Sequence, residues 1–131
     1  MNKRKRFVVQ EHEATRLHWD FRLEINDILK SWAVPKRPPI KPGVRRLAIE
    51  VEDHDLNHLS FEGTIPEGQY GAGTVKIWDL GEFEIESMNT VKIVIRLFGK
   101  KMKGRYALVK FRGENKNWLL IKTKTNDDSE R

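Results

Sequence analysis

The stretch Trp19-Asp-Phe-Arg-Leu-Glu-Ile25 decides the fold class, because apolar and polar residues alternate strictly along it. A period of two is typical of a β-strand with one buried and one polar face. The same alternation returns at residues 46–52 and 91–97. Further short strands are expected at 7–10, 29–34, 60–64, 73–78, 82–86, 106–111 and 118–123.

So many short strands predict an all-β fold, a small closed or nearly closed β-barrel, because closure removes the unpaired edges of a sheet. The dipeptide Asn26-Asp27 can turn one strand into the next. The segment Pro35–Pro42 holds four prolines, which exclude a central strand and predict a stiff basic loop. The only helical turn is expected around Glu13–Leu17.

The composition fits one cytoplasmic domain. The 131 residues suit a single compact unit, 1–131, in which residues 1–6 and 126–131 are expected to be flexible. No apolar run is long enough to cross a bilayer or to act as a signal peptide, which predicts a cytoplasmic protein with no membrane partner. The absence of cysteine excludes disulfides and thiolate metal sites, so a metal would need His, Asp, Glu or backbone oxygen.

The charge is distributed unevenly along the chain. The net charge is +6, and two stretches, 30–46 and 100–112, contain Lys and Arg without any acid. Between them lies the segment 47–75, which contains acids and histidines but neither Lys nor Arg. This pattern indicates an anionic partner such as a nucleic acid, with ordinary solvated faces as the alternative.

Two groups of polar residues are expected to share strand faces. The first group comprises Gln10, His12, His18, Asp20 and Arg22, and the second comprises Arg46, Glu50, Glu52 and His54. Because side chains alternate along a strand, the members of each group on one strand point away from its apolar face. In a barrel with a polar active-site cavity, the two groups would converge.

The chemistry of these residues suits a metal ion and a phosphate. Two imidazoles and one carboxylate hold a divalent ion and leave positions open for water and a substrate oxygen. Such an ion polarises a phosphoryl oxygen, and the planar fork of arginine binds the other oxygens. The spacing His12-x5-His18-x-Asp20 is not a standard zinc signature, so structural or surface histidines remain the alternative. His58 is interpreted as a loop residue outside the metal site.

Two other sequence features favour structural roles. The glycine-rich segment Gly63–Gly73 lacks the Gly-Lys-Ser/Thr ending of a phosphate-binding loop and a following helix. It is therefore interpreted as a tight connection with glycines at special backbone angles. Most aromatic residues occupy apolar strand positions and are expected in the core rather than in an exposed row for stacking bases.

Several motifs together resemble the 3′-phosphoesterase domain of bacterial DNA ligase D. They occur in the family's order over nearly the whole chain, at Phe7–Glu24, Ser31–Lys36, Val51–His54, Phe61–Asp79 and Trp118–Lys122. The chain resembles a stand-alone version of this domain. The resemblance implies a β-barrel that removes 3′-terminal phosphates and 3′-terminal ribonucleosides during DNA repair and non-homologous end joining.

The resemblance also implies roles for single residues. It implies Mn²⁺, with Co²⁺ or Zn²⁺ as other options, bound by His12, Asp20 and His54. The scissile phosphate would contact His18, Arg22 and Arg46, with Lys36 as a weaker candidate. Gln10 and Glu52 would hold the ligands in place. Its substrates would be DNA or RNA-tipped DNA 3′ ends at primer–template junctions, and a separate DNA ligase, polymerase or Ku would be its partner. His58 stands where the family often has Tyr.

Two other functions remain open from the residues alone. One is a non-haem iron oxygenase, because His18, Asp20 and His54 imitate a facial triad. The other is a non-catalytic nucleic-acid-binding module in which the histidines and the aspartate are incidental. Oxygen uptake would identify the first, and binding without end processing would identify the second.

Overall fold

The computed structural model describes residues 4–113 and 115–124. Within these residues the chain forms nine strands and one 3₁₀ turn. They are β1 (Lys5–Glu13), β2 (Leu17–Ile25), β3 (Ile28–Val34), β4 (Arg45–His54), η1 (Leu56–Ser60), β5 (Gly63–Ile65), β6 (Gly73–Met88), β7 (Lys92–Phe98), β8 (Lys103–Lys110) and β9 (Asn117–Lys122). None of the helical structure in this part of the chain is long and apolar enough to span a bilayer.

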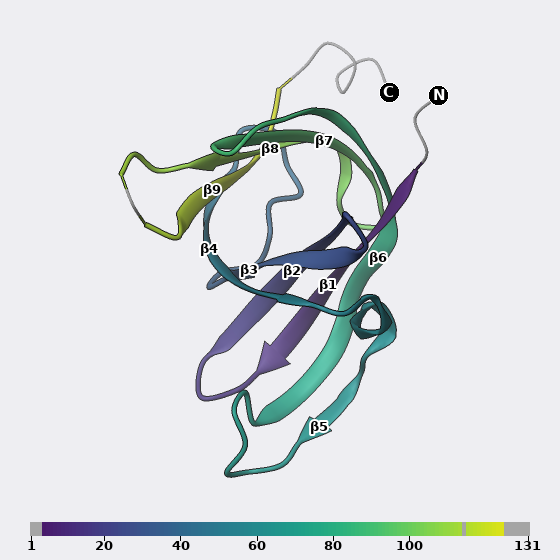
Figure 1. The fold of residues 1–131 in the computed structure, drawn as a ribbon, viewed down its shortest axis with the longest axis vertical. Helices are drawn as coiled ribbons and strands as arrows, with labels where there is room; N and C mark the ends of the chain where they lie inside the picture. Colours follow the sequence, from purple (N-terminus) through teal and green to yellow (C-terminus); the bar gives the residue numbers. More distant parts are fainter. Residues whose placement is uncertain (1–3, 114, 125–131) are drawn as a thin grey trace.

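Eight of the strands close into an antiparallel barrel. They pair in the order β1-β2-β3-β4-β9-β8-β7-β6, and β6 pairs back onto β1. Figure 1 shows this barrel as the ring in the upper part of the molecule. The prediction of an all-β barrel is therefore confirmed.

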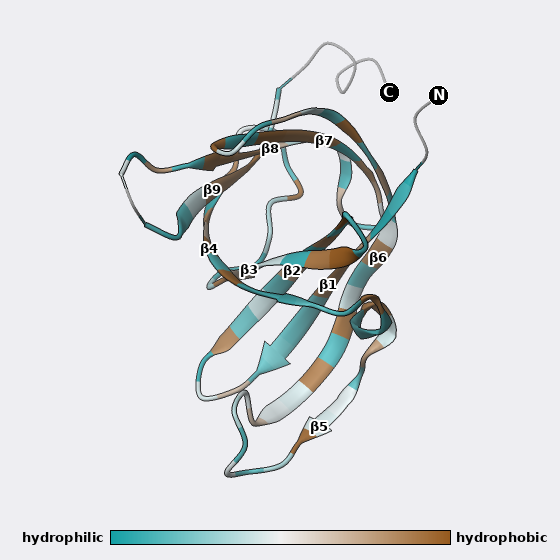
Figure 2. Cartoon of the chain, viewed as in Figure 1, coloured by the Kyte–Doolittle hydropathy of each residue, from teal (hydrophilic) through white to brown (hydrophobic). Residues whose placement is uncertain are grey.

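The interior of the barrel is filled with apolar side chains. Its largest members are fully buried: Trp32, Trp118, Tyr106, Phe7, Phe21 and Phe83. Strands β7 and β8 of the ring are mostly hydrophobic in Figure 2. Burying one such Phe stabilises the fold by roughly 1.5–3 kcal/mol. The polar residues of the β1–β2 hairpin belong to the opposite face, so the polar site lies outside the barrel interior rather than within it.

The β1–β2 hairpin and the first half of β6 extend beyond the ring. There the short strand β5 adds to the free side of β6, as the lower part of Figure 1 shows. A second, smaller apolar cluster packs under this region, formed by Val8, Leu29 and Leu59 with Leu56 and Ile77. Because this cluster includes residues of η1, it fixes the 3₁₀ turn over the outer face of the hairpin.

A β-bulge allows β6 to contribute residues both to the barrel core and to the smaller apolar cluster outside it. Val9 pairs with Asp79 while Gln10 pairs with Ile77, so Trp78 is an extra residue on β6. An extra residue exchanges the two faces of a strand. Ile77 therefore packs in the outer cluster, whereas Phe83, also an odd-numbered residue, lies in the barrel core. The strands expected at 73–78 and 82–86 are one continuous strand of 16 residues.

Some predicted elements are wrong. The helical turn around Glu13–Leu17 does not form, because Glu13 and Leu17 pair with each other as the last rung of the hairpin. The helical structure lies instead at η1, which shifts the strand expected at 60–64 to β5.

The predicted ends and turns had different outcomes. Lys5 and Arg6, expected in a flexible start, belong to β1, where the backbone N–H and guanidinium of Arg6 donate to the Glu24 carboxylate. Residues 126–131 lie outside the described residues. The turn at Asn26 and Asp27 is confirmed, with φ angles of 54° and 65°.

Candidate metal and phosphate site

The pairing of β1 with β2 brings three metal-ligand side chains together on the outer face of the hairpin. His12 pairs with His18, and Gln10 pairs with Asp20. His12 and Asp20 are buried, and one donor atom from each of His12, His18 and Asp20 lies within 4.8 Å of the others. The distances are 3.5 Å from His12 Nδ1 to Asp20 Oδ2 and 3.3 Å from His18 Nε2 to Asp20 Oδ1.

Backbone carbonyls fix the orientation of both imidazole rings. His12 Nε2 lies 2.7 Å from the Gly71 carbonyl, and His18 Nδ1 lies 3.1 Å from the Arg16 carbonyl. A carbonyl only accepts, so these two nitrogens carry the protons and donate. In the neutral rings the lone pairs of His12 Nδ1 and His18 Nε2 consequently face Asp20, and His18 donates to Asp20 from Nε2 only when its ring is protonated. Outer hydrogen bonds of this kind are typical of histidines that bind a metal.

The electrostatics of the group favour an ionised carboxylate. Burial alone would raise the pKa of Asp20, but the hydrogen bond from His18 and the charge of Arg22 together hold that pKa below its ordinary value. The hydrogen bond with Asp20 raises the pKa of His18 despite partial burial. The Asp20 carboxylate therefore carries a negative charge between the two imidazole rings, as a cation site requires.

Arg22 lies beside this group and is held from several directions. Its Nη2 lies 3.4 Å from Asp20 Oδ2, and its Nε donates to Gln10 Oε1 at 2.7 Å. Its Nη1 donates to Ser31 Oγ at 2.9 Å and lies 3.0 Å from His54 Nδ1. Gln10 in turn donates to the backbone carbonyls of η1 and the following residue. Gln10 thus links Arg22 to η1, while its supporting role in the site stays a prediction. Burial lowers the pKa of Arg22.

His54 and His58 lie next to Arg22 as a pair of contacting rings. Their ring centroids are 4.6 Å apart, and His58 stacks on Phe61 at 5.1 Å. Burial and the nearby Arg22 charge lower the pKa of both, that of His58 to about 4. Both imidazoles are therefore neutral at pH 7. His58, interpreted from the sequence as a loop residue, lies in η1 and contacts His54.

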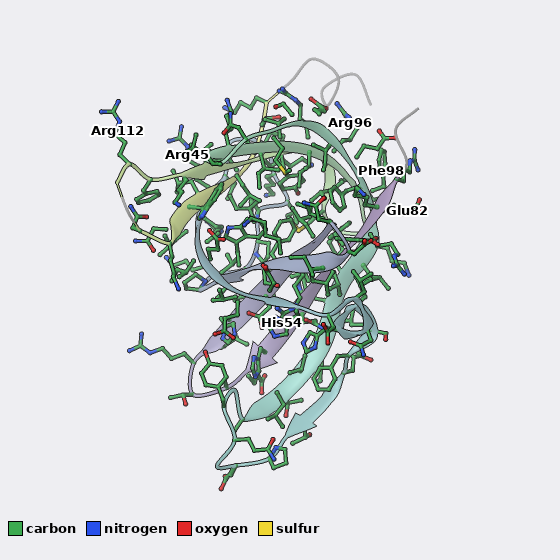
Figure 3. The ribbon with its side chains drawn as sticks, in the orientation of Figure 1. Arg45, His54, Glu82, Arg96, Phe98 and Arg112 are labelled. Carbon is green, nitrogen blue, oxygen red and sulfur yellow. The ribbon has the colours of Figure 1, made fainter. Side chains whose placement is uncertain are left out.

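Figure 3 places His54 below the ring, over the β1–β2 hairpin. Its Nδ1 faces Arg22 and the Glu52 carbonyl, at 3.0 Å and 3.1 Å. Among the described residues, the group of metal-type donors contains His18 and not His54. The ligand set His12, Asp20 and His54 stays a prediction, and the geometry favours His18 as the third ligand.

The second predicted group does not share one face. Ser31 pairs with Val51 while Leu29 pairs with His54, so β4 contains an extra residue between these rungs. This bulge exchanges the faces of the strand. Glu50 therefore lies half-buried on the inner side of the strand, where it accepts from Trp118 Nε1 and Lys30, whereas His54 points to the site. Glu52 is exposed, and its backbone carbonyl rather than its carboxylate contacts His54.

Arg46 and Lys36 lie apart from the buried group. Arg46 donates from Nε to the Arg37 carbonyl at 2.8 Å and lines, with Lys36, a shallow pocket of about 270 Å³. Lys36 follows the end of β3, where Val34 pairs with the residue next to His18. These two cations thus form a basic surface beyond the His18 end of the site.

Sequence reasoning missed the carbonyls of Arg16 and Gly71 and the hydroxyl of Ser31. The carbonyls depend on loop conformations that no side-chain pattern reveals. Ser31 could have been found, because it lies directly opposite Arg22 in the β2–β3 register.

Gly73→Ala is expected to destabilise the site by about 2–3 kcal/mol, because its φ of 139° disfavours a side chain and a Cβ would collide with the Glu13 backbone. Gly68→Ala is the matched control. Its φ is also positive, at 89°, but nothing lies within 4 Å of the added carbon, so about 1 kcal/mol is expected. Urea unfolding of both variants measures the difference, and equal losses would contradict the role of the close approach.

A closed barrel whose projecting hairpin carries a largely buried His–His–Asp group beside an arginine defines a small β-barrel domain with a candidate phosphate-binding centre. Residues 10–110 match the model of the DNA ligase D 3′-phosphoesterase domain. The chain belongs to this family.

The relatives of the chain are multifunctional proteins. It is 46% identical over 129 residues to the multifunctional non-homologous end joining protein LigD of Pseudomonas aeruginosa, covering 93% of this chain and 15% of that protein. It is 46% identical over 126 residues to the multifunctional non-homologous end joining DNA repair protein LigD of Mycobacterium tuberculosis, covering 93% of this chain and 16% of that protein. The LigD of Mycolicibacterium smegmatis is 44% identical over 130 residues, with 91% and 17% covered. The chain thus spans less than a fifth of the length of these relatives.

Proposed function

We propose that this protein is a metal-dependent phosphoesterase that processes DNA 3′ ends in repair, removing a 3′-terminal phosphate or a 3′-terminal ribonucleoside to leave a 3′ hydroxyl. One observation carries the proposal: the lone pairs of two carbonyl-anchored histidines face one buried carboxylate, directly beside a buried arginine. Membership of the 3′-phosphoesterase family supports the same chemistry.

His12, His18 and Asp20 would hold the divalent ion. Two imidazole nitrogens and a carboxylate oxygen suit Mn²⁺ and also accept Co²⁺ or Zn²⁺. When bound, such an ion supplies Lewis-acid polarisation of a phosphoryl oxygen. The Gly71 and Arg16 carbonyls keep both rings in the tautomers that this binding needs.

Arg22 and His54 would bind the phosphate itself. Gln10 and Ser31 hold the guanidinium in place, so it can neutralise phosphate charge without reorganising. When His54 Nδ1 accepts from Arg22, its proton resides on Nε2. That N–H can then donate a hydrogen bond to a substrate oxygen, which suits a neutral His54 to positioning the phosphate and stabilising its charge.

The composition of the metal group alone would also fit an iron oxygenase, which uses two histidines and one carboxylate. The buried Arg22, within 3.4 Å of Asp20, favours a phosphoesterase over an iron oxygenase, because a guanidinium matches the geometry of phosphate oxygens. The phosphoesterase is therefore the function that the site supports best.

The basic surface at Lys36 and Arg46 would contact the strand behind its 3′ end. Binding through such phosphate contacts weakens as salt rises. The substrates proposed are DNA or RNA-tipped DNA 3′ ends at primer–template junctions. A separate DNA ligase, polymerase or Ku is the proposed partner in end joining.

A gel assay with a 5′-labelled primer annealed to a longer template tests the proposal. One primer ends in a 3′ phosphate and another in a single 3′ ribonucleotide, each with Mn²⁺ or excess EDTA. We expect the phosphate to be removed and the ribonucleotide end to be shortened with Mn²⁺ alone, because the metal ligands are the core of the site. Binding of both primers without any change in either would replace the enzyme with a nucleic-acid-binding module.

A further inference from the structure

The loop between β5 and β6 presents an aromatic ring entirely to solvent. Tyr70 is 102% exposed, whereas the other exposed large hydrophobic residues in the described part of the chain are 36–53% exposed. A tyrosine normally buries much of its ring, because the ring is mostly apolar. This residue therefore differs in kind from an ordinary surface aromatic residue.

The backbone that carries Tyr70 is held by two successive turns. The N–H of Gln69 donates to the Pro66 carbonyl at 3.3 Å, and the N–H of Ala72 donates to the Gln69 carbonyl at 3.1 Å. In each turn the third residue is a glycine with positive φ, 89° at Gly68 and 77° at Gly71, as a type II turn requires. Tyr70 occupies the second position of the second turn, so its exposure follows from a defined backbone.

The same loop is tied to the candidate metal group. The carbonyl of Gly71, the residue next to Tyr70, accepts from His12 Nε2 at 2.7 Å. Gly73, at the end of the loop, packs against the backbone of Glu13 and Ala14 in the β1–β2 turn. The backbone of Tyr70 is thus one residue from an atom that orients a metal ligand.

We propose that Tyr70 stacks on the base of the 3′-terminal nucleotide while the phosphate of that nucleotide occupies the site. This inference rests on the proposed function and adds the element that recognises the nucleoside. Every base offers a flat π-face, so stacking accepts any terminal base. A fully exposed ring on a loop that is tied to the candidate metal group suits an enzyme that must act on ends of any sequence.

The kinetic test compares two primers with a 3′ phosphate, one ending in a normal nucleotide and one ending in an abasic sugar. Tyr70→Ala is expected to raise KM for the normal end about five- to hundredfold with little change in kcat, the range that one lost base–aromatic contact gives. It should leave KM for the abasic end unchanged. Tyr70→Phe should behave like the wild type. Phe111→Ala is the control, because Phe111 is exposed but lies at the end of β8, beside Arg112 at the far tip in Figure 3.

A fluorescence test separates this inference from the proposed function. A primer that ends in 2-aminopurine with a 3′ phosphate, kept intact by excess EDTA, is saturated with protein, and a 5′ dye confirms binding by anisotropy. Wild type and Phe111→Ala are expected to quench the terminal base, and Tyr70→Ala is not. Quenching that depends on Tyr70 without turnover of any primer would keep the stacking and reject the phosphoesterase. Equal quenching by Tyr70→Ala, or equal KM changes on both ends, would overturn the inference.

Discussion

Asp20→Asn is expected to lower kcat/KM for 3′-phosphate removal by about a thousandfold or more while leaving the fold intact. Asp20 is the carboxylate that both histidine lone pairs face, so its charge holds the cation site together. A lost metal ion removes several kcal/mol of transition-state stabilisation, and about 4 kcal/mol corresponds to a thousandfold in rate. Steady-state kinetics on the 3′-phosphate primer and Mn²⁺ titration by calorimetry measure both losses.

The matched control is Asp27→Asn, in the turn between β2 and β3, where an exposed aspartate adopts a φ of 65° that asparagine also tolerates. It should retain full activity. The same titration decides the third ligand: His18→Ala is expected to lose Mn²⁺ affinity, and His54→Ala is expected to keep it while losing turnover. The reverse result would restore His54 to the ligand set. Full activity in Asp20→Asn with an unchanged circular dichroism spectrum would place the catalytic metal elsewhere.

Asp79→Ala is expected to reduce the free energy of unfolding by about 3–5 kcal/mol. The carboxylate of Asp79 is 3% exposed and accepts from the backbone N–H groups of Leu80, Lys100, Lys101 and Met102, at 2.8–3.1 Å. It therefore ties β6 to the turn between β7 and β8. Removing it leaves the buried N–H of Met102 and three partly buried N–H groups without an acceptor. Each hydrogen bond to a charged group contributes about 1.5–3 kcal/mol, although not additively.

Urea unfolding followed by tryptophan fluorescence measures this loss. Asp79→Asn keeps one acceptor oxygen and should lose less than the alanine variant. Asp53→Ala, an exposed aspartate on β4, should change stability by less than about 0.5 kcal/mol. A loss below about 1 kcal/mol for Asp79→Ala would show that water replaces the carboxylate in the turn.

The sequence predicts the barrel because most of its strands alternate apolar and polar residues without interruption. The alternation at Trp19, Phe21 and Leu23 correctly puts these residues in the core and His18 and Asp20 on the opposite face. Periodicity fails where a bulge inserts a residue, at Trp78 in β6 and after Val51 in β4. A bulge has no compositional signal here, so parity wrongly groups Glu50 with His54.

The other failures have the same physical origin, since they depend on long-range contacts. The 3₁₀ turn η1 forms over an apolar cluster that joins Leu59 to Val8 and Leu29, residues distant in sequence. The association of His18 with His12 and Asp20 follows from hairpin register, which fixes the pairs His12–His18 and Gln10–Asp20. That register can be predicted from the sequence only if the position of the hairpin turn is predicted correctly first.

Because of the bulges at Trp78 and after Val51, the geometry of the site depends on the exact number of residues in β6 and β4. Deleting one residue at Trp78 would turn the outer face of one end of β6 inward, and deleting one of residues 52–53 would direct His54 towards the barrel. Single-residue insertions or deletions at these points are therefore more damaging than most substitutions, whereas a change of two residues preserves the facing of both ends. Engineered and natural variants of this domain should therefore keep the same number of residues from Val51 to His54 and from Ile77 to Asp79. The identities of the residues between them can change.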